Sequence, residues 1–310
     1  MTALICGSMA YDTLMRFEGR FHEHILPDQI HKLNVSFYVP GMRRNFGGCA
    51  GNIAYNLKLL GGDGVIMAAV GHDFGPYARW MTQHGLADTY LKMVPEEFTA
   101  QAFITSDLDS NQITAFHPGA MNYSHMNKVS NTQGIRLGIV GPDSRLAMIE
   151  HAQQFADIGV PFIFDLGQGM PLFNGEDLRN FIHQAAWAAF NDYEASVVSE
   201  RTGWSLEELA KRVRALIVTR GAEGSWIFAD GRRVDIPAAP ISKVAEPTGC
   251  GDAYRAGLLF GLQNGLDWQT TGRIASLLGA IKIEADGPQT HHFTLDEFKA
   301  RFAKAFGRSL

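Results

Sequence analysis

A helix entrance near the C-terminus combines glycines with an aspartate, in AEPTGCGDAYRAGLLFGL at residues 245–262. The first backbone N–H groups of a helix have no partner within it and favour an anion, and glycine permits close approach of a phosphate. We interpret Gly249, Cys250 and Gly251 as an anion hole for a transferring phosphoryl group. Asp252 is then the base that accepts a proton from the attacking hydroxyl. An acid that only stabilises the first helical turn explains Asp252 equally well from this segment alone.

A second pair of glycines precedes a helix near the N-terminus, in FGGCAGNIAYNL at residues 46–57. Gly48 permits a ligand close to the backbone, and Asn52 offers a donor and an acceptor that suit a diol. Asp12, which follows the first predicted strand, binds hydroxyls in the same way. Ordinary turn chemistry and local backbone capping are the alternatives for these three residues.

Asn191 and Glu194 stand three residues apart in FNDYEA at residues 190–195. Hard oxygen ligands at that spacing suit a hydrated Mg²⁺ bound to phosphates, directly or through water. The same spacing is the capping box of a helix N-terminus, so both interpretations stay open.

The turn in VTRGAEGSW, residues 218–226, supplies Thr219, Gly221 and Gly224. Such a turn lies against a nucleotide or simply joins two strands. Other routes to phosphoryl transfer lack their motifs, because there is no GxxxxGK[ST] loop. HDFG at residues 72–75 has no HRD loop or GxGxxG before it, so we interpret it as a coincidence.

Six short apolar runs predict buried parallel strands near helix-like segments: ALICGS, GVIMAAVG, RLGIVG, VPFIFDLG, WAAFND and ALIVTRG. This alternation predicts a doubly wound α/β fold, whose ligands bind at the carboxyl ends of the strands. Four residues follow such runs: Asp165, Asn191, Thr219 and Gly221. QAFITSDLDSNQITAFHPG predicts two further strands around a polar turn, either an ordinary hairpin or part of a lid. We assign the lid to about 12–46 and 98–120 of a single domain spanning 1–310.

The composition is typical of a soluble globular protein, with 46% hydrophobic and 19% charged residues among 310. A net charge of -5 gives no electrostatic reason to expect a nucleic-acid partner. No window approaches the roughly 20 apolar residues of a membrane span, and no signal-peptide pattern is present, so we expect a cytoplasmic protein. Cys6, Cys49 and Cys250 lack paired spacing and predict no structural metal. The adjacent His291 and His292 are interpreted as surface residues.

Taken together and in this order, these segments resemble the ribokinase family, also called the phosphofructokinase B family of sugar and nucleoside kinases. The matching segments are FGGCAGN, VGHDFG, NDYE, VTRGAEG and PTGCGDAYRAGLL, and the similarity covers essentially the whole chain. The resemblance implies a ribokinase-like three-layer α/β sandwich with a mostly parallel central sheet and a small β-sheet lid. It also implies transfer of the γ-phosphoryl group of ATP to a hydroxymethyl group.

The resemblance assigns roles to single residues, with Asp252 as the base and residues 249–251 as the anion hole. The other roles are these: Asn191 and Glu194 organise Mg²⁺; Asn191, Thr219, Gly221 and Gly224 lie on the ATP side; Gly287 and Gln289 border the nucleotide base; Asp12, Gly48 and Asn52 bind ribose-like hydroxyls. The family's last motif usually begins Asp-Thr-Thr-Gly-Ala-Gly-Asp, whereas here Glu246 and Pro247 replace the first two residues. The change to Glu246 leaves the contribution of a monovalent cation open.

The amino-acid sequences of the motifs are most similar to those of bacterial ribonucleoside kinases of the adenosine-kinase type. This implies an ATP- and Mg²⁺-dependent kinase that makes nucleoside 5′-monophosphates, with adenosine as the first substrate to test and inosine as another. Phe116 and Phe103 then stack on the base or belong to the lid core. Arg43 and Arg44 keep a sugar or phosphosugar kinase open as the alternative. The intact motifs argue against a non-catalytic binding protein, and the sequence leaves base preference and oligomeric state open.

Overall fold

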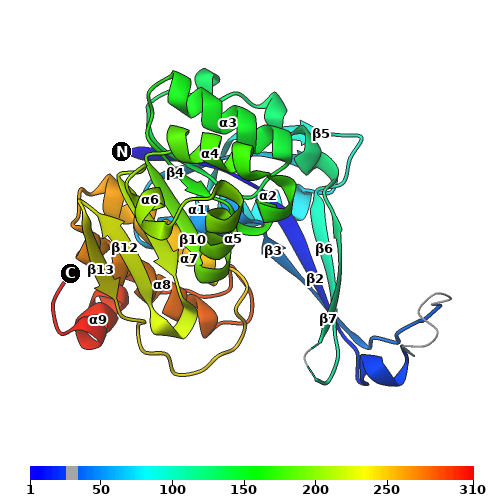
Figure 1. Ribbon diagram of the computed structural model, residues 1–310. Helices are drawn as coiled ribbons and strands as arrows, with labels where there is room; N and C mark the ends of the chain where they lie inside the picture. The colour runs from blue at the N-terminus through cyan, green and yellow to red at the C-terminus, as the bar shows by residue number, and fades with distance from the viewer. Residues whose placement is uncertain (26–33, 110) are drawn as a thin grey trace.

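The computed structural model describes residues 1–25, 34–109 and 111–310, and shows a layered body from which a small sheet projects (Figure 1). The main sheet has the strand order β13-β12-β11-β10-β9-β8-β1-β4-β5. Its strands are β1 (Thr2–Cys6), β4 (Gly64–Gly71), β5 (Ala87–Val94), β8 (Ile135–Val140), β9 (Phe162–Asp165), β10 (Trp187–Asn191), β11 (Ala215–Thr219), β12 (Ser225–Ala229) and β13 (Arg232–Ile236). All neighbours from β11 to β5 pair in parallel, and β12 and β13 add an antiparallel edge.

The six strands predicted from apolar runs are confirmed, because they form β1, β4, β8, β9, β10 and β11. The apolar runs do not predict β5, since its sequence ADTYLKMV is half exposed at the edge of the sheet and lacks a continuous apolar run. β12 and β13 form a hairpin at the opposite edge. The turn after β11 joins β11 to β12, which pair antiparallel, so the alternative that this turn joins two strands is present.

Helices cover both faces of the main sheet, and each face has its own core. Along β1, Ala3 and Ile5 belong to one core whereas Leu4 and Cys6 belong to the other, as the alternation of a strand requires. The first core also takes residues from α1 (Cys49–Leu59), α2 (Gly75–Gln83), α7 (Cys250–Gln263), α8 (Trp268–Ile283) and α9 (Leu295–Phe306). The second takes residues from α3 (Arg145–Asp157), α4 (Gly175–Gln184), α5 (Asp192–Thr202) and α6 (Leu206–Ala210). The connections contain the 3-10 segments η1 (Phe21–Glu23), η3 (Gly119–Met126), η4 (Val129–Asn131), η5 (Gly167–Leu172) and η6 (Gly221–Glu223).

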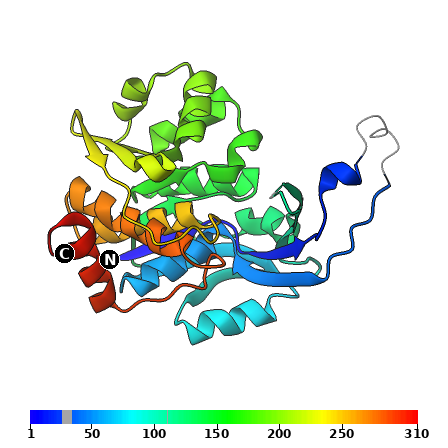
Figure 2. The same cartoon turned by 90° about the horizontal axis from the view of Figure 1, so that it is seen from below.

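The projecting sheet, which we call the lid, has the order β3-β2-β6-β7 and stands away from the body (Figure 2). Its strands are β2 (Ala10–Arg16), β3 (Gly41–Gly47), β6 (Ala100–Ser106) and β7 (Gln112–His117). Asp12 pairs with Ala102, and Ala102 pairs with Phe116, so these three side chains share one face. The next row contains Thr13 and Phe103 and therefore points to the opposite face. Residues 26–33 of the predicted lid and Ser110 of its predicted turn lie outside the described residues.

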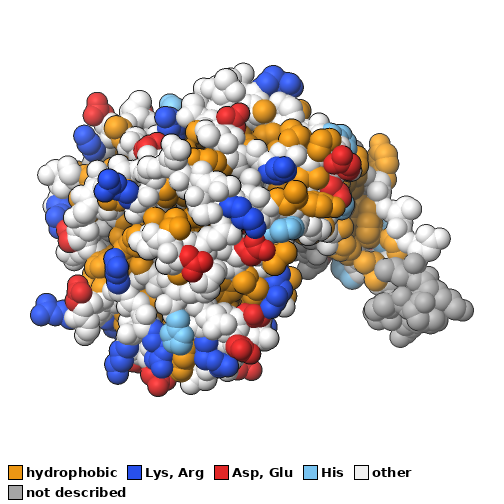
Figure 3. Space-filling view, turned by 90° about the horizontal axis from the view of Figure 1, so that it is seen from above, with side chains coloured by type: hydrophobic (Ala, Val, Ile, Leu, Met, Phe, Trp, Pro, Cys, Tyr) orange, Lys and Arg blue, Asp and Glu red, His pale blue; other side chains and the backbone are white. Residues whose placement is uncertain are grey.

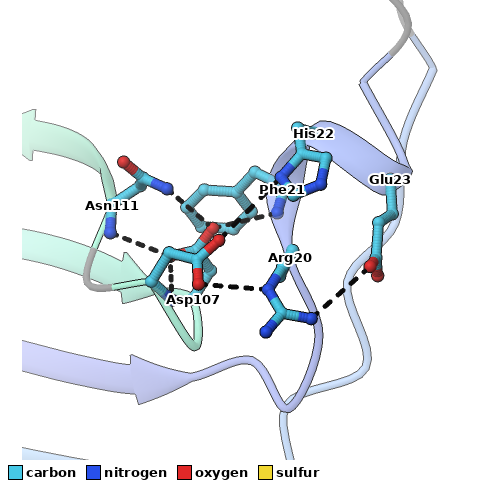
Figure 4. A network of polar contacts seen from close by, with 7 residues as sticks. Arg20, Phe21, His22, Glu23, Asp107 and Asn111 are labelled. Carbon is cyan, nitrogen blue, oxygen red and sulfur yellow. Dashed lines mark hydrogen bonds and ion pairs between the residues drawn. The ribbon is translucent and has the colours of Figure 1, made fainter.

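A single carboxylate joins two segments of the chain that meet at the lid tip (Figure 4). Asp107, which follows β6, accepts hydrogen bonds from the N–H of Phe21 in η1 at 3.0 Å and of Asn111 at 2.8 Å. The Asn111 side chain donates to it as well, at 3.0 Å. Burial alone would raise the pKa of Asp107, but the hydrogen bonds from Phe21 and Asn111 together outweigh it and lower the pKa below its usual value. The β6–β7 turn and the segment around η1 are therefore held together.

The molecular surface mixes both signs of charge, and Figure 3 shows acidic and basic side chains interspersed on one face of the body. Hydrophobic side chains also reach this surface, which is normal for a folded chain. Within the described ranges, none of the helices has the length and apolar character that crossing a membrane demands.

Candidate active site

The entrance to α7 presents the backbone amides of the predicted anion hole. In the described part of the chain, the N–H groups of Gly249, Gly251 and Asp252 have no hydrogen-bond partner. The N–H of Cys250 differs, because it donates to the Pro247 carbonyl at 3.2 Å. The free donors at the positive end of a 14-residue helix form a site that favours an anion. Gly249 and Gly251 therefore fit the anion-hole prediction better than Cys250 does.

Asp252 lies in the first turn of α7, beside these amides. Its carboxylate accepts a hydrogen bond from Asn52 Nδ2 at 2.8 Å, across 200 residues of sequence. Desolvation raises the pKa of Asp252 to about 7, and the bond from Asn52 opposes that shift by favouring the ionised form. The side chain is still partly open to solvent. A reachable carboxylate that titrates near neutral pH is suited to accept a proton from a bound hydroxyl.

Gln289 fixes the side-chain amide of Asn52 by a hydrogen bond. Its Nε2 donates to Asn52 Oδ1 at 3.0 Å and to the Tyr77 hydroxyl at 2.6 Å. Its Oε1 accepts a hydrogen bond from Trp80 Nε1 at 3.0 Å. Gln289 is buried, and both of its polar groups are used within the protein. Gln289 is predicted to border the nucleotide base, and in the structure its side chain fixes the amide that contacts Asp252.

Asp12 reaches the same point from the lid. Burial raises the pKa of Asp12 to about 6, and the charge of Glu246 adds to the shift. The charge of Asp12 in turn contributes to the raised pKa of Asp252, after burial and the charge of Asp165. Gly47 makes room for this approach, since a Cβ at that position would overlap the Asp12 carboxylate. Asn45, which pairs with Asp12 across β2 and β3, contributes a buried Nδ2 without a partner among the described residues.

Asn45 was missed by sequence reasoning because its relevance depends on strand register. The signal available in the sequence was only its position two residues before the predicted glycine pair. Gly48, by contrast, is predicted to contact substrate. A Cβ there would lie 2.5 Å from the Ser8 carbonyl oxygen, so this glycine brings the entrance of α1 against the loop after β1. Gly48 is therefore required first for backbone packing.

Two residues that are predicted to lie on the ATP side, Asn191 and Thr219, pair at the carboxyl ends of β10 and β11. Asn191 and Glu194 form the capping box of α5: the Asn191 N–H donates to Glu194 Oε2 at 2.8 Å, and the Glu194 N–H donates to Asn191 Oδ1 at 2.7 Å. The capping alternative is thus present in the structure. Side-chain oxygens in a box of this kind keep free lone pairs for water, which fits a Mg²⁺ held mainly by phosphates and water.

The remaining predicted glycines lie in different surroundings. Gly221 faces open space, with no protein atom within 4 Å of the point where a Cβ would stand, and is accessible to a ligand. Gly224 packs against the carbonyl of Ile236 in β13, so it serves the hairpin edge. Gly287 lies next to Asn45, near the base of the lid, rather than beside Thr219.

The two lid phenylalanines point to opposite faces of the lid sheet. Phe116 shares the face of Asp12 and is 53% exposed, so it is free to cover a ligand bound there. Phe103 lies in the row of Thr13 and Ala115, on the other face. The structure therefore brings only Phe116 together with Asp12, and the pairing of both rings over one base does not match the register.

A buried ion-pair cluster joins Asp165 and Glu194 to Arg255, the one member that sequence reasoning missed. Arg255 Nη2 donates to Asp165 Oδ1 at 2.9 Å and to the Ala189 carbonyl at 3.2 Å. The same nitrogen lies 3.9 Å from Glu194 Oε2. An arginine on the buried side of α7 was the available signal. The Arg255 side chain thus lies between α7 and Glu194 in the first turn of α5, and its charge partly offsets the raised pKa of Asp252.

His291 is buried, which corrects the prediction that it is a surface residue. Its ring Nε2 is 2.8 Å from Asn56 Oδ1, and its carbonyl accepts a hydrogen bond from the Tyr55 hydroxyl. The chain immediately after Gln289 is thereby fixed to α1. Among residues 1–25, 34–109 and 111–310, no three His, Cys, Asp or Glu side chains are grouped to hold a metal.

We expect alanine substitution to affect stability at Gly249 and phosphate binding at Gly251. Gly249 has a φ of 83° and its Cβ would lie 2.9 Å from Pro288 Cβ, so Gly249→Ala should lose about 1–2 kcal/mol of unfolding free energy. At Gly251 a Cβ meets no protein atom closer than Arg255 Nη1 at 4.0 Å, so Gly251→Ala should fold normally while its methyl group intrudes on a bound phosphate. Denaturant unfolding and the KM for ATP measure the two effects. Normal use of ATP by the Gly251→Ala variant would contradict the anion-site assignment.

Comparison with known proteins places the chain among kinases. The family model of the pfkB family carbohydrate kinases matches residues 10–294. A nucleoside kinase of Methanocaldococcus jannaschii is 32% identical over 275 residues, which cover 87% of this chain and 90% of that protein. An aminoimidazole riboside kinase of Salmonella typhimurium is 24% identical over 79% of this chain and 83% of that protein.

The fold agrees with a solved nucleoside kinase of Burkholderia thailandensis. Its structure in complex with inosine is 54% identical, covers 99% of each chain and superposes with a TM-score of 0.91. Its structure in complex with ADP-inosine is 55% identical, covers 99% of this chain and 97% of that chain, and has a TM-score of 0.88. These matches confirm the predicted ribokinase-like fold with a large, mostly parallel sheet and a small second sheet. From the family match and these relatives, the chain belongs to the pfkB family of carbohydrate kinases and is a phosphotransferase that acts on a hydroxyl group.

Proposed function

We propose that this chain transfers the γ-phosphoryl group of ATP to the 5′-hydroxyl of a ribonucleoside, with inosine and adenosine as substrates. The observation that carries the proposal is the hydrogen bond from Asn52 to Asp252, which holds a carboxylate in the first turn of α7 beside its free amides. The relatives named as nucleoside kinases, and the solved complexes with inosine and with ADP-inosine, support this choice of substrates.

The residues divide the proposed reaction between them. Asp12 and Asn45 bind the ribose hydroxyls, and Phe116 covers the base from the lid. Asp252 accepts the proton of the 5′-hydroxyl while the oxygen of that hydroxyl bonds to the γ-phosphorus. The bond between the γ-phosphorus and the oxygen that bridges it to the β-phosphate breaks, which releases ADP. The free amides at residues 249 and 251 stabilise the charge on the transferred group.

Asn191 and Glu194 would hold Mg²⁺ through water, and the ion would neutralise charge on the phosphates of ATP. Thr219 and Gly221 border the same nucleotide, since Thr219 ends β11 beside Asn191 and Gly221 follows that strand. The capping box fixes both metal-side residues in place whether or not the ion is bound.

A substrate panel tests the proposal. Inosine, adenosine, ribose and fructose 6-phosphate would each be assayed with ATP and Mg²⁺. We expect kcat/KM for a nucleoside to exceed that for ribose by on the order of 10²-fold, because ribose lacks the base that contributes binding energy. The competing outcome is a preference for fructose 6-phosphate. Arg43 would then bind the phosphate, because Arg43 pairs with Leu14, on the same lid face as Asp12. Arg44 lies over the Tyr11 ring on the opposite face. Higher kcat/KM for either sugar would overturn the nucleoside assignment and leave the family assignment intact.

A further inference from the structure

A lysine ammonium lies inside a cage of oxygen atoms behind the anion site. Lys282, in the last turn of α8, is 0% exposed. Its Nζ donates to the Glu246 carbonyl at 2.5 Å and to the Ala285 carbonyl at 3.4 Å, and lies 3.7 Å from Glu246 Oε2. A buried ammonium requires oxygens that replace its lost water, and these three atoms supply them.

The cage attaches the loop before α7 to the end of α8. The N–H groups of Ala245 and Glu246 both donate to the Ile283 carbonyl, at 2.8 and 3.3 Å. The Glu246 carboxylate also accepts a hydrogen bond from the Thr248 N–H at 2.9 Å. Because Gly249 follows directly as the N-cap of α7, the backbone held by Lys282 sets the position of the anion-site amides.

Carbonyl and carboxylate oxygens from two loops are the ligands that a bare monovalent cation takes in proteins. The family resemblance left such an ion open for this chain, but the residues present do not fit one, because Nζ and its charge already lie among the oxygens. Burial, and then the charge of Lys282, lower the pKa of the nearby His291 to about 4, so this ring is neutral at pH 7 and brings no second charge.

We propose that Lys282 is a built-in cation, a positioning residue that orders the loop of the anion site, so that phosphoryl transfer by this chain needs no free K⁺. The proposal rests on the anion site of the function proposed above. It concerns the placement of Gly249 and Gly251 rather than contact with the substrate.

The first experiment uses the unaltered protein. Initial rates with inosine, ATP and Mg²⁺ are compared in KCl and in tetramethylammonium chloride at equal ionic strength. We expect the rates to agree within about twofold, and the melting temperature to be equal in both salts, because a cation with no site cannot stabilise the fold by binding. A several-fold stimulation by K⁺, or a melting temperature that rises with K⁺, would overturn the proposal.

Two variants test the role of the side chain. Lys282→Met removes the charge while filling the space, and we expect kcat/KM for ATP to fall on the order of 10²-fold through misplacement of the loop. Lys282→Ala leaves the oxygens around a vacated space, so added K⁺ or methylammonium should raise its melting temperature and restore part of its rate. Lys304→Ala, at an exposed lysine in the last turn of α9, is the matched control and should change neither property.

The outcomes separate this inference from the substrate assignment. A folded Lys282→Met variant with unchanged kcat/KM for ATP would show that Lys282 does not position the loop before α7. If neither variant folds, the salt comparison on the unaltered protein decides the question. If inosine is the wrong acceptor, the unaltered protein shows no turnover, while the response of the Lys282→Ala melting temperature to K⁺ still reports on the cage.

Discussion

Replacing Asp252 with asparagine is expected to lower kcat/KM for inosine by roughly 10²–10⁴-fold, the usual contribution of a positioned general base. The amide retains an oxygen that accepts from Asn52 but cannot accept the substrate proton. The fold should keep its stability, because desolvation disfavours the charged carboxylate that the substitution removes. Steady-state kinetics and thermal unfolding of the same preparation measure both expectations.

The pH dependence gives an independent readout of the same residue. Because burial raises the pKa of Asp252 to about 7, kcat/KM should fall as the pH drops below 7 and level off above it. The residual activity of the Asp252→Asn variant should lack this titration. Asp296→Asn, at an exposed acid in the first turn of α9, is the control for a simple helix-dipole effect and should leave turnover unchanged. Near-normal turnover by the Asp252→Asn variant would rule out the base.

Replacing Arg255 with methionine should cost about 3–5 kcal/mol of unfolding free energy, because it leaves buried carboxylates without their positive partner. Asp165 loses its 2.9 Å hydrogen bond, and Glu194 loses the charge 3.9 Å away. Denaturant unfolding measures the loss. Adding Asp165→Asn to the same chain should recover part of it, since one of the unpaired charges is then removed.

The matched control for this stability effect is Arg233→Met. Arg233 pairs with Asp235 at the surface, where both side chains are at least half exposed, and such pairs contribute about 0–1 kcal/mol. Equally small losses of unfolding free energy for Arg255→Met and Arg233→Met would show that the buried ion pairs contribute no more stability than the surface pair. The double variant also distinguishes charge from packing, because only an unpaired charge is relieved by Asp165→Asn.

The main sheet could be predicted from the sequence because buried parallel strands are continuous apolar runs bounded by glycine or polar residues. The same logic fails for β5, whose exposed edge position lets lysine, aspartate and threonine interrupt the run. Asp252 could also be predicted, since glycines and an acid at a helix entrance leave a local signal. Its hydrogen bond to Asn52 could be anticipated only through the family resemblance, because 200 residues separate the two.

The sequence does not predict the placement of residues whose surroundings depend on strand register or on distant partners. Phe103 and Phe116 look alike in sequence, and only the pairing of Ala102 with Phe116 shows that they point to opposite faces. Gln289 carries no mark of its three hydrogen bonds to α1 and α2. Lys282 ends an apolar helix as a lysine commonly does, and its burial against Glu246 depends on a loop 36 residues earlier.

The carboxylate of Asp107 has a mechanical consequence for the lid. It fastens the turn after β6 to the segment around Phe21, so the two hairpin ends cannot separate while its hydrogen bonds persist. Together with the strand pairing that joins Asp12 to Ala102 and Ala102 to Phe116, these bonds lead us to expect that the lid moves as one plate. For the proposed nucleoside kinase reaction, we therefore expect the sugar and the base to be enclosed in one movement and the product to leave when the whole sheet moves back.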